Sequence, residues 1–560
     1  MTMPNPSPQD NRNLLIAVLV FALVFMGFDY FRIKNAPEAQ NTNLGQQAQS
    51  INEENGSGVQ SPGAPKLENS LSGSLATNAL RADERTLIDI RSATLEGRAA
   101  LKGGRIDKLY LPQYKESMDG KEPVQIFKPS GDKVFFYEAG WLAETLSTPD
   151  GNTLWQAKDT KLTPENPLLI TWESPDGLQF QRQFILNPES YTITIIDGVS
   201  NNTQKPASLV HYAQIHKGMT PQVLKEQSGL STFTRFVGPE GVLNGEHQTI
   251  DYSDLQKNGS SSFLSRQGWA GISTPYFLAA LVPEQQEMDK KITYRHSQVR
   301  AKDFFSVDVQ SLPLVVQPQE YVEQVYSVYA GPKRIDLLEK QGANLDRAVD
   351  FGWYHIIAKF FFDIVMWFYA LVGNLGVAVI LVTCLIKLTL WPLAGKSYVA
   401  MSRMKQLQPK IMQLKEKHGD DRQAMSMEMM ALYRQHKVNP MSGCWPVLIQ
   451  IPIFFAFYKM ILISFEFRHE PFMLWIQDLS ARDPYFVLPL LMGATMVIQQ
   501  KLNPAPADPV QEKVMKILPV MFTIIFAMFP AGLVLYWTTN SILSVAQQWF
   551  VMRRLGVKVS

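Results

Sequence analysis

The sequence contains very few cysteines and almost no net charge. Its 560 residues include two cysteines, Cys384 and Cys444, and the formal net charge is +2. The segment 81–345 has no cysteine, so no disulfide can hold it. Two cysteines so far apart in sequence do not make a metal site, and we expect neither a metal nor a cofactor. The small net charge excludes a polybasic nucleic-acid binder, so no DNA partner is expected.

A catalytic signature is also missing from the polar part of the chain. Residues 81–345 contain short runs of β-branched and aromatic residues bounded by Pro, Gly, Asn or Asp, which predict a large antiparallel β-sandwich domain. Clear examples are NPLLITWE, LQFQRQFIL, YTITIIDGV and SLVHYAQIH. His211 and His216 lie in the last run without an evident set of catalytic partners, and we interpret them as ordinary residues of this domain.

Long apolar runs are confined to a block near the N-terminus and to the last 210 positions. The block at about 14–31 predicts an uncleaved signal-anchor span within 1–34, since no small-residue cleavage site follows it. A cleaved signal peptide is the alternative. Residues 35–80 are rich in Asn, Gln, Ser, Gly and Pro, which predicts a flexible linker.

The apolar region that starts at 351 is too long for one span. A helix over 351–393 would be about 65 Å long, twice the thickness of a bilayer, so it must break. Gly373, Asn374 and Gly376 mark the break. Within 373–552 the spans are predicted at about 373–393, 445–465, 485–501, 514–530 and 532–552. With the N-terminal anchor they predict a multi-pass α-helical membrane protein with six spans.

The segment 351–371, before the break, has one narrow polar stripe. His355, Lys359 and Asp363 follow one another at intervals of four residues, which places them on one helical face. This pattern predicts an amphipathic helix in the membrane interface, with an ion pair between Lys359 and Asp363.

The distribution of basic residues predicts the orientation. Loop 394–444 contains nine Lys or Arg against four Asp or Glu, and loop 466–484 contains two against four. The short tail 553–560 adds three basic residues and no acidic one. The positive-inside rule therefore places loop 394–444 and both termini in the cytoplasm, and the β domain on the opposite side.

Residues 396–437, in the cytoplasmic loop, predict a basic, Met-rich helical hairpin. Arg403, Lys410 and Lys417 recur every seven residues on one face. An apolar seam on another face consists of Ala400, Met404, Leu407, Ile411 and Leu414. The hairpin is either a solvated element near lipid head groups or a docking platform for a hydrophobic or RNA-bearing partner.

Lys387, in the stretch LVTCLIKLTLWPLAGK (381–396), places a positive charge inside the predicted span 373–393. A lysine at the bilayer centre costs about 3 kcal/mol, unless it snorkels to the cytoplasmic head groups. Thr383 lies one turn earlier, and Gln450 is expected at a similar depth in its span. The last span becomes polar in the same half of the membrane, at Thr538, Thr539, Asn540, Ser541, Ser544, Gln547 and Gln548. These residues predict a hydrated cavity that is open to the cytoplasm and contains one positive charge.

Four stretches resemble a known family. LVGNLG (371–376), NPMSGCWPVLIQIPIFFAFYKM (439–460), PFMLWIQDLSARDPY (471–485) and FPAGLVLYW (529–537) are similar to the YidC membrane-protein insertases of Gram-negative bacteria, in the wider Oxa superfamily. The resemblance is most specific over about 350–552. It implies a periplasmic β-supersandwich after the first span, then five core spans around a hydrophilic groove with one positive residue.

The resemblance assigns Lys387 as the groove charge, where the family usually has arginine. Lysine keeps the charge but lacks the guanidinium fork, so a point-charge mechanism is compatible and a bidentate one is not. Hairpin residues implied to contact partners are Arg403, Lys410 and Lys417. Residues implied to line the groove or contact clients are Thr383, Gln450, Tyr536, Trp537, Asn540 and Ser544; the family often has tyrosine where Trp537 stands.

The function implied by the resemblance is insertion and folding of inner-membrane proteins, with no enzymatic step. Implied partners are nascent membrane-protein clients, membrane lipids and the Sec translocon (SecYEG and SecDF), with the ribosome and signal-recognition components left open. A solute transporter or channel with a periplasmic receptor domain is the alternative. A membrane-anchored carbohydrate enzyme is weaker, because paired carboxylates are not evident and five further spans would have no role.

Overall fold

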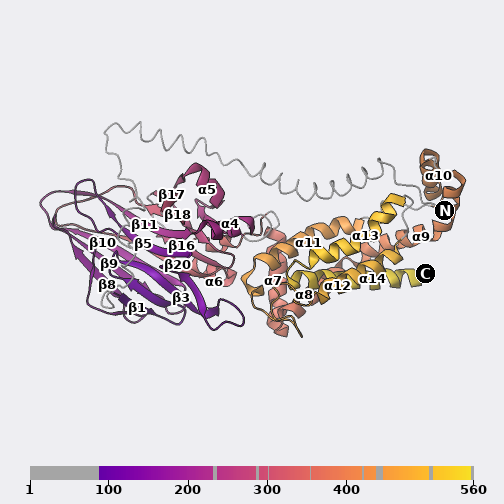
Figure 1. Ribbon diagram of the computed structural model, residues 1–560, viewed down its shortest axis with the longest axis horizontal. Coiled ribbons are helices and arrows are strands. Elements are labelled where there is room, and N and C mark those ends of the chain that lie inside the picture. Colours follow the sequence, from indigo (N-terminus) through magenta and orange to yellow (C-terminus); the bar gives the residue numbers. More distant parts are fainter. Residues whose placement is uncertain are drawn as a thin grey trace. The chain divides into compact units, whose positions relative to one another are not determined.

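The computed structural model describes residues 87–230, 236–284, 289–299, 302–352, 355–418, 422–436, 445–503 and 509–556. The predicted anchor span, the linker and the last four residues of the tail lie outside these ranges. The described chain forms two units, which we call the β domain, ending at Asp350, and the helical unit, beginning at Phe351 (Figure 1). Each unit is described by itself.

The β domain consists of two sheets. Within the described residues the first sheet has 11 strands: β1 (Leu87–Arg91), β2 (Glu96–Ala100), β3 (Arg105–Lys115), β4 (Pro123–Phe127), β5 (Lys133–Leu142), β7 (Lys161–Leu162), β11 (Ala207–Met219), β14 (Ser260–Ser265), β17 (Lys290–Val299), β18 (Lys302–Gln310) and β19 (Leu314–Val316). The second has 9 strands: β6 (Gln156–Ala157), β8 (Leu168–Glu173), β9 (Leu178–Leu186), β10 (Thr192–Asn201), β12 (Gly238–Leu243), β13 (Glu246–Thr249), β15 (Gly268–Ser273), β16 (Phe277–Pro283) and β20 (Tyr321–Pro332). Short helical segments are α4 (Pro221–Leu230), α5 (Tyr252–Asn258), α6 (Ile335–Gln341) and a 3-10 turn (Leu345–Ala348).

The prediction of a large antiparallel β domain is confirmed. The strand pairs are antiparallel, with the exception of the short parallel pair β1 and β7. Strand β9 shows why the sequence folds this way, because its residues alternate between buried and half-buried along its whole length. The alternation directs Phe180, Arg182 and Phe184 to the buried face. A guanidinium therefore lies in an otherwise apolar row and requires a partner inside the domain.

The helical unit consists of α-helices, with a connection of 23 residues (464–486) between α11 and α12. In chain order they are α7 (His355–Val372), α8 (Leu375–Thr389), α9 (Trp391–His418), α10 (Arg422–Gln435), α11 (Trp445–Ile463), α12 (Val487–Leu502), α13 (Pro509–Phe526) and α14 (Ala531–Arg554), with a 3-10 turn at Phe465–Phe467. Helix α14 packs against α8, α9, α11 and α12. It is therefore the element around which a site in this unit is built.

The predicted break before the second span is confirmed. Helix α7 ends at Val372, and Gly373 follows with a φ of +67°, a conformation that glycine adopts without steric cost. Asn374 then caps α8, because its side-chain oxygen accepts a hydrogen bond of 3.0 Å from the backbone N–H of Val377. The predicted pair in α7 is also confirmed, since Lys359 Nζ lies 3.1 Å from an oxygen of Asp363.

The helix that carries Lys387 is shorter than the sequence pattern suggests. The expected span continues to 393, but α8 ends at Thr389 and the chain bends by 67° into α9. Pro392 explains the change, because proline has no N–H to continue α8 and is favoured in the first turn of a new helix.

Length and composition single out α7 among the described helices. It is the one that is both long and apolar enough to cross a membrane by itself, and α8 with α9 passes the same test as a bent pair. The sequence pattern instead suggests that α7 lies in the interface, because of its polar stripe. The arrangement of six spans stays a prediction.

Candidate functional site

Polar residues form a stripe along one face of α14. Tyr536, Asn540 and Ser544 are spaced by four residues. All three are buried, although their side chains are polar. At 1.5 Å per residue the stripe is about 12 Å long. Two other predicted groove residues, Lys387 and Gln450, contact this stripe.

Lys387 reaches this stripe from α8. Its ammonium donates a hydrogen bond of 2.8 Å to Oγ of Ser544, and the side chain is half-buried. Within the described part of the chain no carboxylate forms an ion pair with Lys387. A hydroxyl carries no net charge, so this hydrogen bond does not neutralise the ammonium as a carboxylate would.

Gln450 reaches the other end of the stripe from α11. Its Nε2 donates a hydrogen bond of 3.0 Å to the phenolic oxygen of Tyr536. The ring of Tyr536 stacks on Phe457, with centroids 4.4 Å apart. The structure thus brings together Lys387, Gln450 and the stripe, residues separated by up to 157 positions in sequence.

Thr383 is buried one turn before Lys387, as predicted from their spacing. Its hydroxyl donates a hydrogen bond of 2.7 Å to the backbone oxygen of Val379, within α8. The hydroxyl hydrogen is therefore used inside the helix, which leaves only the lone pairs of the Thr383 oxygen to accept another hydrogen bond.

Trp537 faces an aromatic cluster and not the polar stripe. It follows Tyr536 by one residue, which turns it by about 100° around α14. Its ring lies 4.8 Å from that of Phe454 in α11 and 5.3 Å from that of Phe526 in α13. Polar and aromatic surfaces therefore lie side by side on α14.

The hairpin consists of α9 and α10; residues 419–421, between them in sequence, lie outside the described ranges. Met404 and Leu407 of the predicted seam are buried against Tyr433 of α10, among others. The three predicted basic residues, Arg403, Lys410 and Lys417, are exposed. Lys417 pairs with Glu428 at 3.1 Å, and Nζ of Lys410 lies 3.2 Å from Nε2 of His436.

Sequence analysis missed Tyr398, which lies near the start of α9. It is buried, on a helix that packs against α14. A spacing of eleven residues from Lys387 corresponds to about three helical turns and could have indicated a shared face. The bend between α8 and α9 hides that signal.

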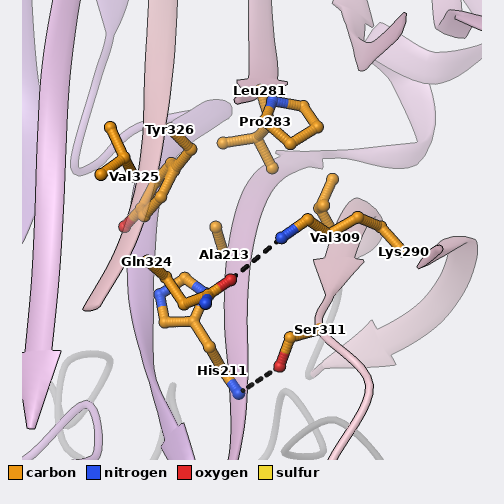
Figure 2. Close-up of a pocket in the computed structure, with 10 residues that line it drawn as sticks. All are labelled: His211, Ala213, Leu281, Pro283, Lys290, Val309, Ser311, Gln324, Val325 and Tyr326. Atoms are coloured by element: carbon orange, nitrogen blue, oxygen red, sulfur yellow. Dashed lines mark hydrogen bonds between the residues drawn. The ribbon is translucent and has the colours of Figure 1, made fainter. Parts of the chain in front are cut away.

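The β domain contains a small cavity between its two sheets, shown in Figure 2. Its volume is about 20 Å³, close to the space that one water molecule needs. Polar side chains that line it include His211, Lys290, Ser311 and Gln324, and Lys290 donates a hydrogen bond of 2.9 Å to Gln324. The cavity is too small for an organic ligand.

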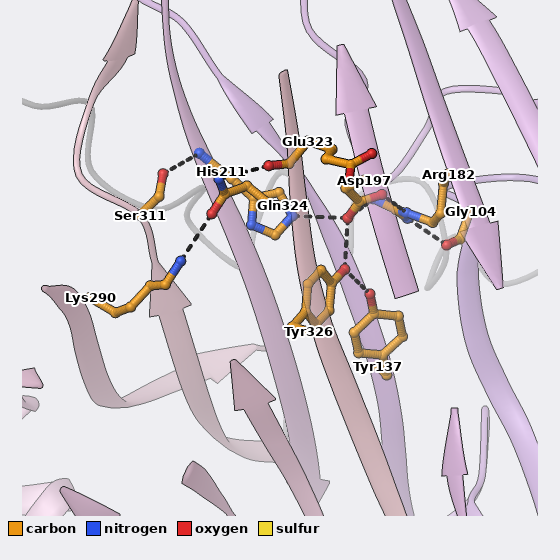
Figure 3. Close-up of polar contacts among 10 residues, drawn as sticks. All are labelled: Gly104, Tyr137, Arg182, Asp197, His211, Lys290, Ser311, Glu323, Gln324 and Tyr326. Atoms are coloured by element: carbon orange, nitrogen blue, oxygen red, sulfur yellow. Dashed lines mark hydrogen bonds and ion pairs between the residues drawn. The ribbon is translucent and has the colours of Figure 1, made fainter. Parts of the chain in front are cut away.

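A buried polar network adjoins this cavity (Figure 3). Asp197 in β10 binds Arg182 in the neighbouring strand β9, and it accepts hydrogen bonds from His211 (2.9 Å) and from the hydroxyl of Tyr326 (2.7 Å). Tyr326 is in turn hydrogen-bonded to Tyr137, which belongs to the other sheet. The network therefore joins the two sheets.

The protonation states in the network follow from burial and charge. Burial would raise the pKa of Asp197, but the Arg182 guanidinium and the hydrogen bond from His211 outweigh it and lower the pKa to about 2. Burial lowers the pKa of His211 despite Asp197. His211 is then neutral at pH 7 and donates its Nε2 hydrogen to the carboxylate.

His216 is also buried with partners that the sequence did not indicate. Its Nε2 lies 3.1 Å from Glu138 and 3.1 Å from Gln214. Both histidines have thus acquired polar partners through strand pairing and sheet packing. Among the described residues, neither histidine lines a cavity large enough for a substrate. We therefore continue to interpret His211 and His216 as structural.

The comparisons with known proteins agree with the two units. The family described as YidC periplasmic domain matches residues 87–364, and the family described as 60Kd inner membrane protein matches residues 367–558. A membrane protein insertase YidC of Magnetococcus marinus is 37% identical over 98% of this chain and 99% of its own length. Similar insertases of Rickettsia bellii and Rhizobium meliloti are 35% and 34% identical, over 96% and 98% of this chain and 98% and 97% of theirs.

A solved structure is also similar. The crystal structure of an active YidC insertase with its first transmembrane domain resolved has 18% identity and a TM-score of 0.36, over 82% of this chain and 92% of that one. The curated relatives named above are all called membrane protein insertases, which leaves the transporter alternative without support. From the two family matches and the full-length relatives, the chain belongs to the family of YidC membrane protein insertases.

Proposed function

We propose that this YidC-family insertase draws the polar N-terminal segment of a client into the stripe on α14 by the charge of Lys387. The observation that carries the proposal is the ammonium of Lys387, half-buried and held by the neutral Ser544. A client carboxylate is a stronger acceptor than a hydroxyl for this donor. At contact distance and an effective dielectric constant near 20 the attraction is about 4 kcal/mol, and less where water enters.

The client's apolar segment has a different surface to follow. The ring of Trp537 adjoins Phe454 of α11 and Phe526 of α13, and these helices correspond to the third and fifth predicted spans. In the proposed mechanism the apolar segment slides along this aromatic surface into lipid, while the polar segment stays at the stripe. The polar segment then has only the remaining apolar half of the membrane to cross.

The topology is part of the proposal. Six spans, with the anchor at about 14–31 as the first, place both termini and the hairpin in the cytoplasm of a Gram-negative cell and the β domain in the periplasm. The exposed Arg403, Lys410 and Lys417 would then face cytoplasmic partners. We propose the ribosome or signal-recognition components there, and the Sec translocon within the membrane.

The test is insertion of a client into proteoliposomes that contain the purified protein. Lys387→Ala is expected to reduce insertion of a client with an acidic N-terminal segment about tenfold or more, and Lys387→Arg to preserve it, because only the charge is required. A second client carries Gln and Asn in place of the acidic residues. Lys387→Ala should change the insertion of this neutral client little. Equal insertion of the acidic client by wild type and Lys387→Ala would refute the role of the charge.

A matched control is available at the base of the hairpin. Lys396 is exposed and lies nine positions after Lys387, so Lys396→Ala removes the same charge outside the stripe. This variant is expected to insert the acidic client as wild type does. If both alanine variants lose insertion equally, overall charge and not the position of Lys387 is responsible.

A further inference from the structure

The last turns of α14 present an exposed surface on the side opposite the polar stripe. Ile542, Trp549 and Arg553 are exposed and follow one another at intervals of seven and four residues, which places them on one face of the helix. Ser544 comes two residues after Ile542 and is turned from it by about 200°. The stripe and the exposed face therefore belong to different sides of α14, and the proposed role of Lys387 does not use the exposed face.

The bend between α8 and α9 adjoins this face. The ring of Trp391, the first residue of α9, lies 6.2 Å from the ring of Phe550 in an edge-to-face arrangement. Gln547 donates a hydrogen bond of 3.4 Å to the backbone oxygen of Trp391, which holds the bend against α14. Leu388, one turn before Trp391, is 65% exposed. We call the following residues the Trp549 face: Leu388, Trp391, Ile542, Trp549, Phe550 and Arg553.

Arg553 is oriented by an aromatic ring and not by an acid. Its guanidinium carbon lies over the Trp549 ring, 5.4 Å from the centroid, which is a cation–π distance. The described part of the chain gives Arg553 no carboxylate partner. A guanidinium stacked in this way keeps the N–H donors at its edge available, and their fork matches the oxygens of a phosphate.

The sequence around the Trp549 face carries positive charge and no negative charge. Residues 364–415, which include α8 and most of α9, contain six Lys or Arg and no Asp or Glu. Residues 513–560, which include α14, contain five Lys or Arg and again no Asp or Glu. The face is therefore complementary to a ligand that is both apolar and negatively charged.

We propose that the Trp549 face binds one anionic phospholipid. The phosphate pairs with Arg553, the head group lies beside Trp549 and Trp391, and an acyl chain follows Ile542. Eleven residues separate Ile542 from Arg553, which corresponds to about 16 Å along the helix. One leaflet of a bilayer has a hydrocarbon thickness of about 15 Å, so the apolar part of the face has the length that an acyl chain requires.

The test uses the full chain in phosphatidylcholine vesicles that contain a small fraction of a photoactivatable lipid. The reactive group lies near the phosphate of either phosphatidylglycerol or phosphatidylcholine, and crosslinks in the peptide that contains Trp549 are counted by mass spectrometry. We expect the phosphatidylglycerol probe to label this peptide about threefold to tenfold more than the phosphatidylcholine probe. Equal labelling by the two probes overturns the proposal. Both leaflets contain the probe, so the result is independent of the orientation of the protein.

Two neighbouring arginines provide a matched control. Arg553 and Arg554 are both exposed, but in the described chain Arg553 lies over an aromatic ring and Arg554 does not. Arg553→Gln should bring the ratio of the two probes close to one, whereas Arg554→Gln should keep at least half of the preference. An equal loss in the two variants would mean that anionic lipids are attracted by overall charge, which overturns a specific site.

The ring and the lipid are tested separately. Trp549→Phe keeps an aromatic ring under Arg553 and should keep the preference for phosphatidylglycerol, whereas Trp549→Leu should reduce it. Excess inorganic phosphate, added at constant ionic strength, should leave the labelling unchanged. Loss of labelling in phosphate would identify the free anion as the ligand and overturn the lipid proposal. None of these measurements involves a client, so their failure leaves the proposed role of Lys387 unaffected.

Discussion

The two units treat a buried cation in opposite ways. In the β domain Arg182 is fully buried, and its guanidinium lies 2.5 Å from the carboxylate of Asp197. In the helical unit Lys387 is half-buried, and its ammonium contacts the hydroxyl of Ser544. The first charge is neutralised inside the protein and contributes to the packing of two sheets. The second contacts a neutral group and has no carboxylate partner among the described residues, which under the proposed function leaves it open to pairing with an acidic client segment.

The largest effect is expected when the internal pair of the β domain is broken. Asp197→Ala leaves the guanidinium of Arg182 buried without its carboxylate and removes the acceptor of His211 and Tyr326. We expect a loss of about 3–5 kcal/mol in the stability of the domain. Thermal unfolding of the full chain in detergent, followed by tryptophan fluorescence, measures it. Replacing Arg182 and Asp197 together by Met and Leu should cost clearly less, and an equal cost would mean that packing rather than charge is responsible.

Lys217 extends the comparison between the two units, because it is a buried lysine of the β domain that, like Lys387, contacts a hydroxyl. Its other neighbours are aromatic rings. Its Nζ donates to the hydroxyl of Tyr252 over 3.2 Å and lies 5.7 Å from the centre of the Phe135 ring. Burial, with a smaller contribution from Lys133, lowers the pKa of Lys217 from 10.5 to about 7. The β domain can thus accommodate a lysine without a carboxylate by favouring its neutral form.

The pH dependence of stability follows from that shift. Between pH 7 and about 10.5 the unfolded chain binds the proton of Lys217 and the folded chain does not, so this residue makes the β domain more stable as the pH rises. The free-energy penalty for burying the protonated Lys217 in the folded domain applies in full below pH 7. It amounts to a few kcal/mol, at about 1.4 kcal/mol per unit of pKa. Lys217→Met is expected to raise the unfolding midpoint at pH 7 and to remove this slope. The same slope in the variant would show that another group causes it.

Some of these features could be predicted from the sequence because they are local. The alternation in 178–186 predicts strand β9, and the Gly373–Asn374 pair predicts the end of α7. The pairing of Lys359 with Asp363 needs only the helical repeat. In each case the residues that interact lie within a few positions of one another, so backbone geometry alone brings them together.

Features that depend on packing could not be predicted. Asp197 meets Arg182 through the register of β10 on β9, and it meets His211 only because the two sheets face one another. In the helical unit the sequence indicates polar residues on α14 and a charge on α8, but not which of them touch. The burial of Tyr398 in α9 was missed entirely, because it depends on a bend of 67° between two helices.

The smallest effect on stability is expected at Lys387, the residue with the largest expected effect on insertion. Lys387→Met removes a charge whose placement in a membrane costs about 3 kcal/mol, and it also removes one hydrogen bond to Ser544, worth about 1 kcal/mol. The helical unit should therefore be unchanged or more stable by about 1–2 kcal/mol, which reversible unfolding in mixed micelles can detect. Clear destabilisation would mean that Lys387 is a structural charge like Arg182. A stable variant that no longer inserts an acidic client would show that the charge is retained for the client and not for the fold.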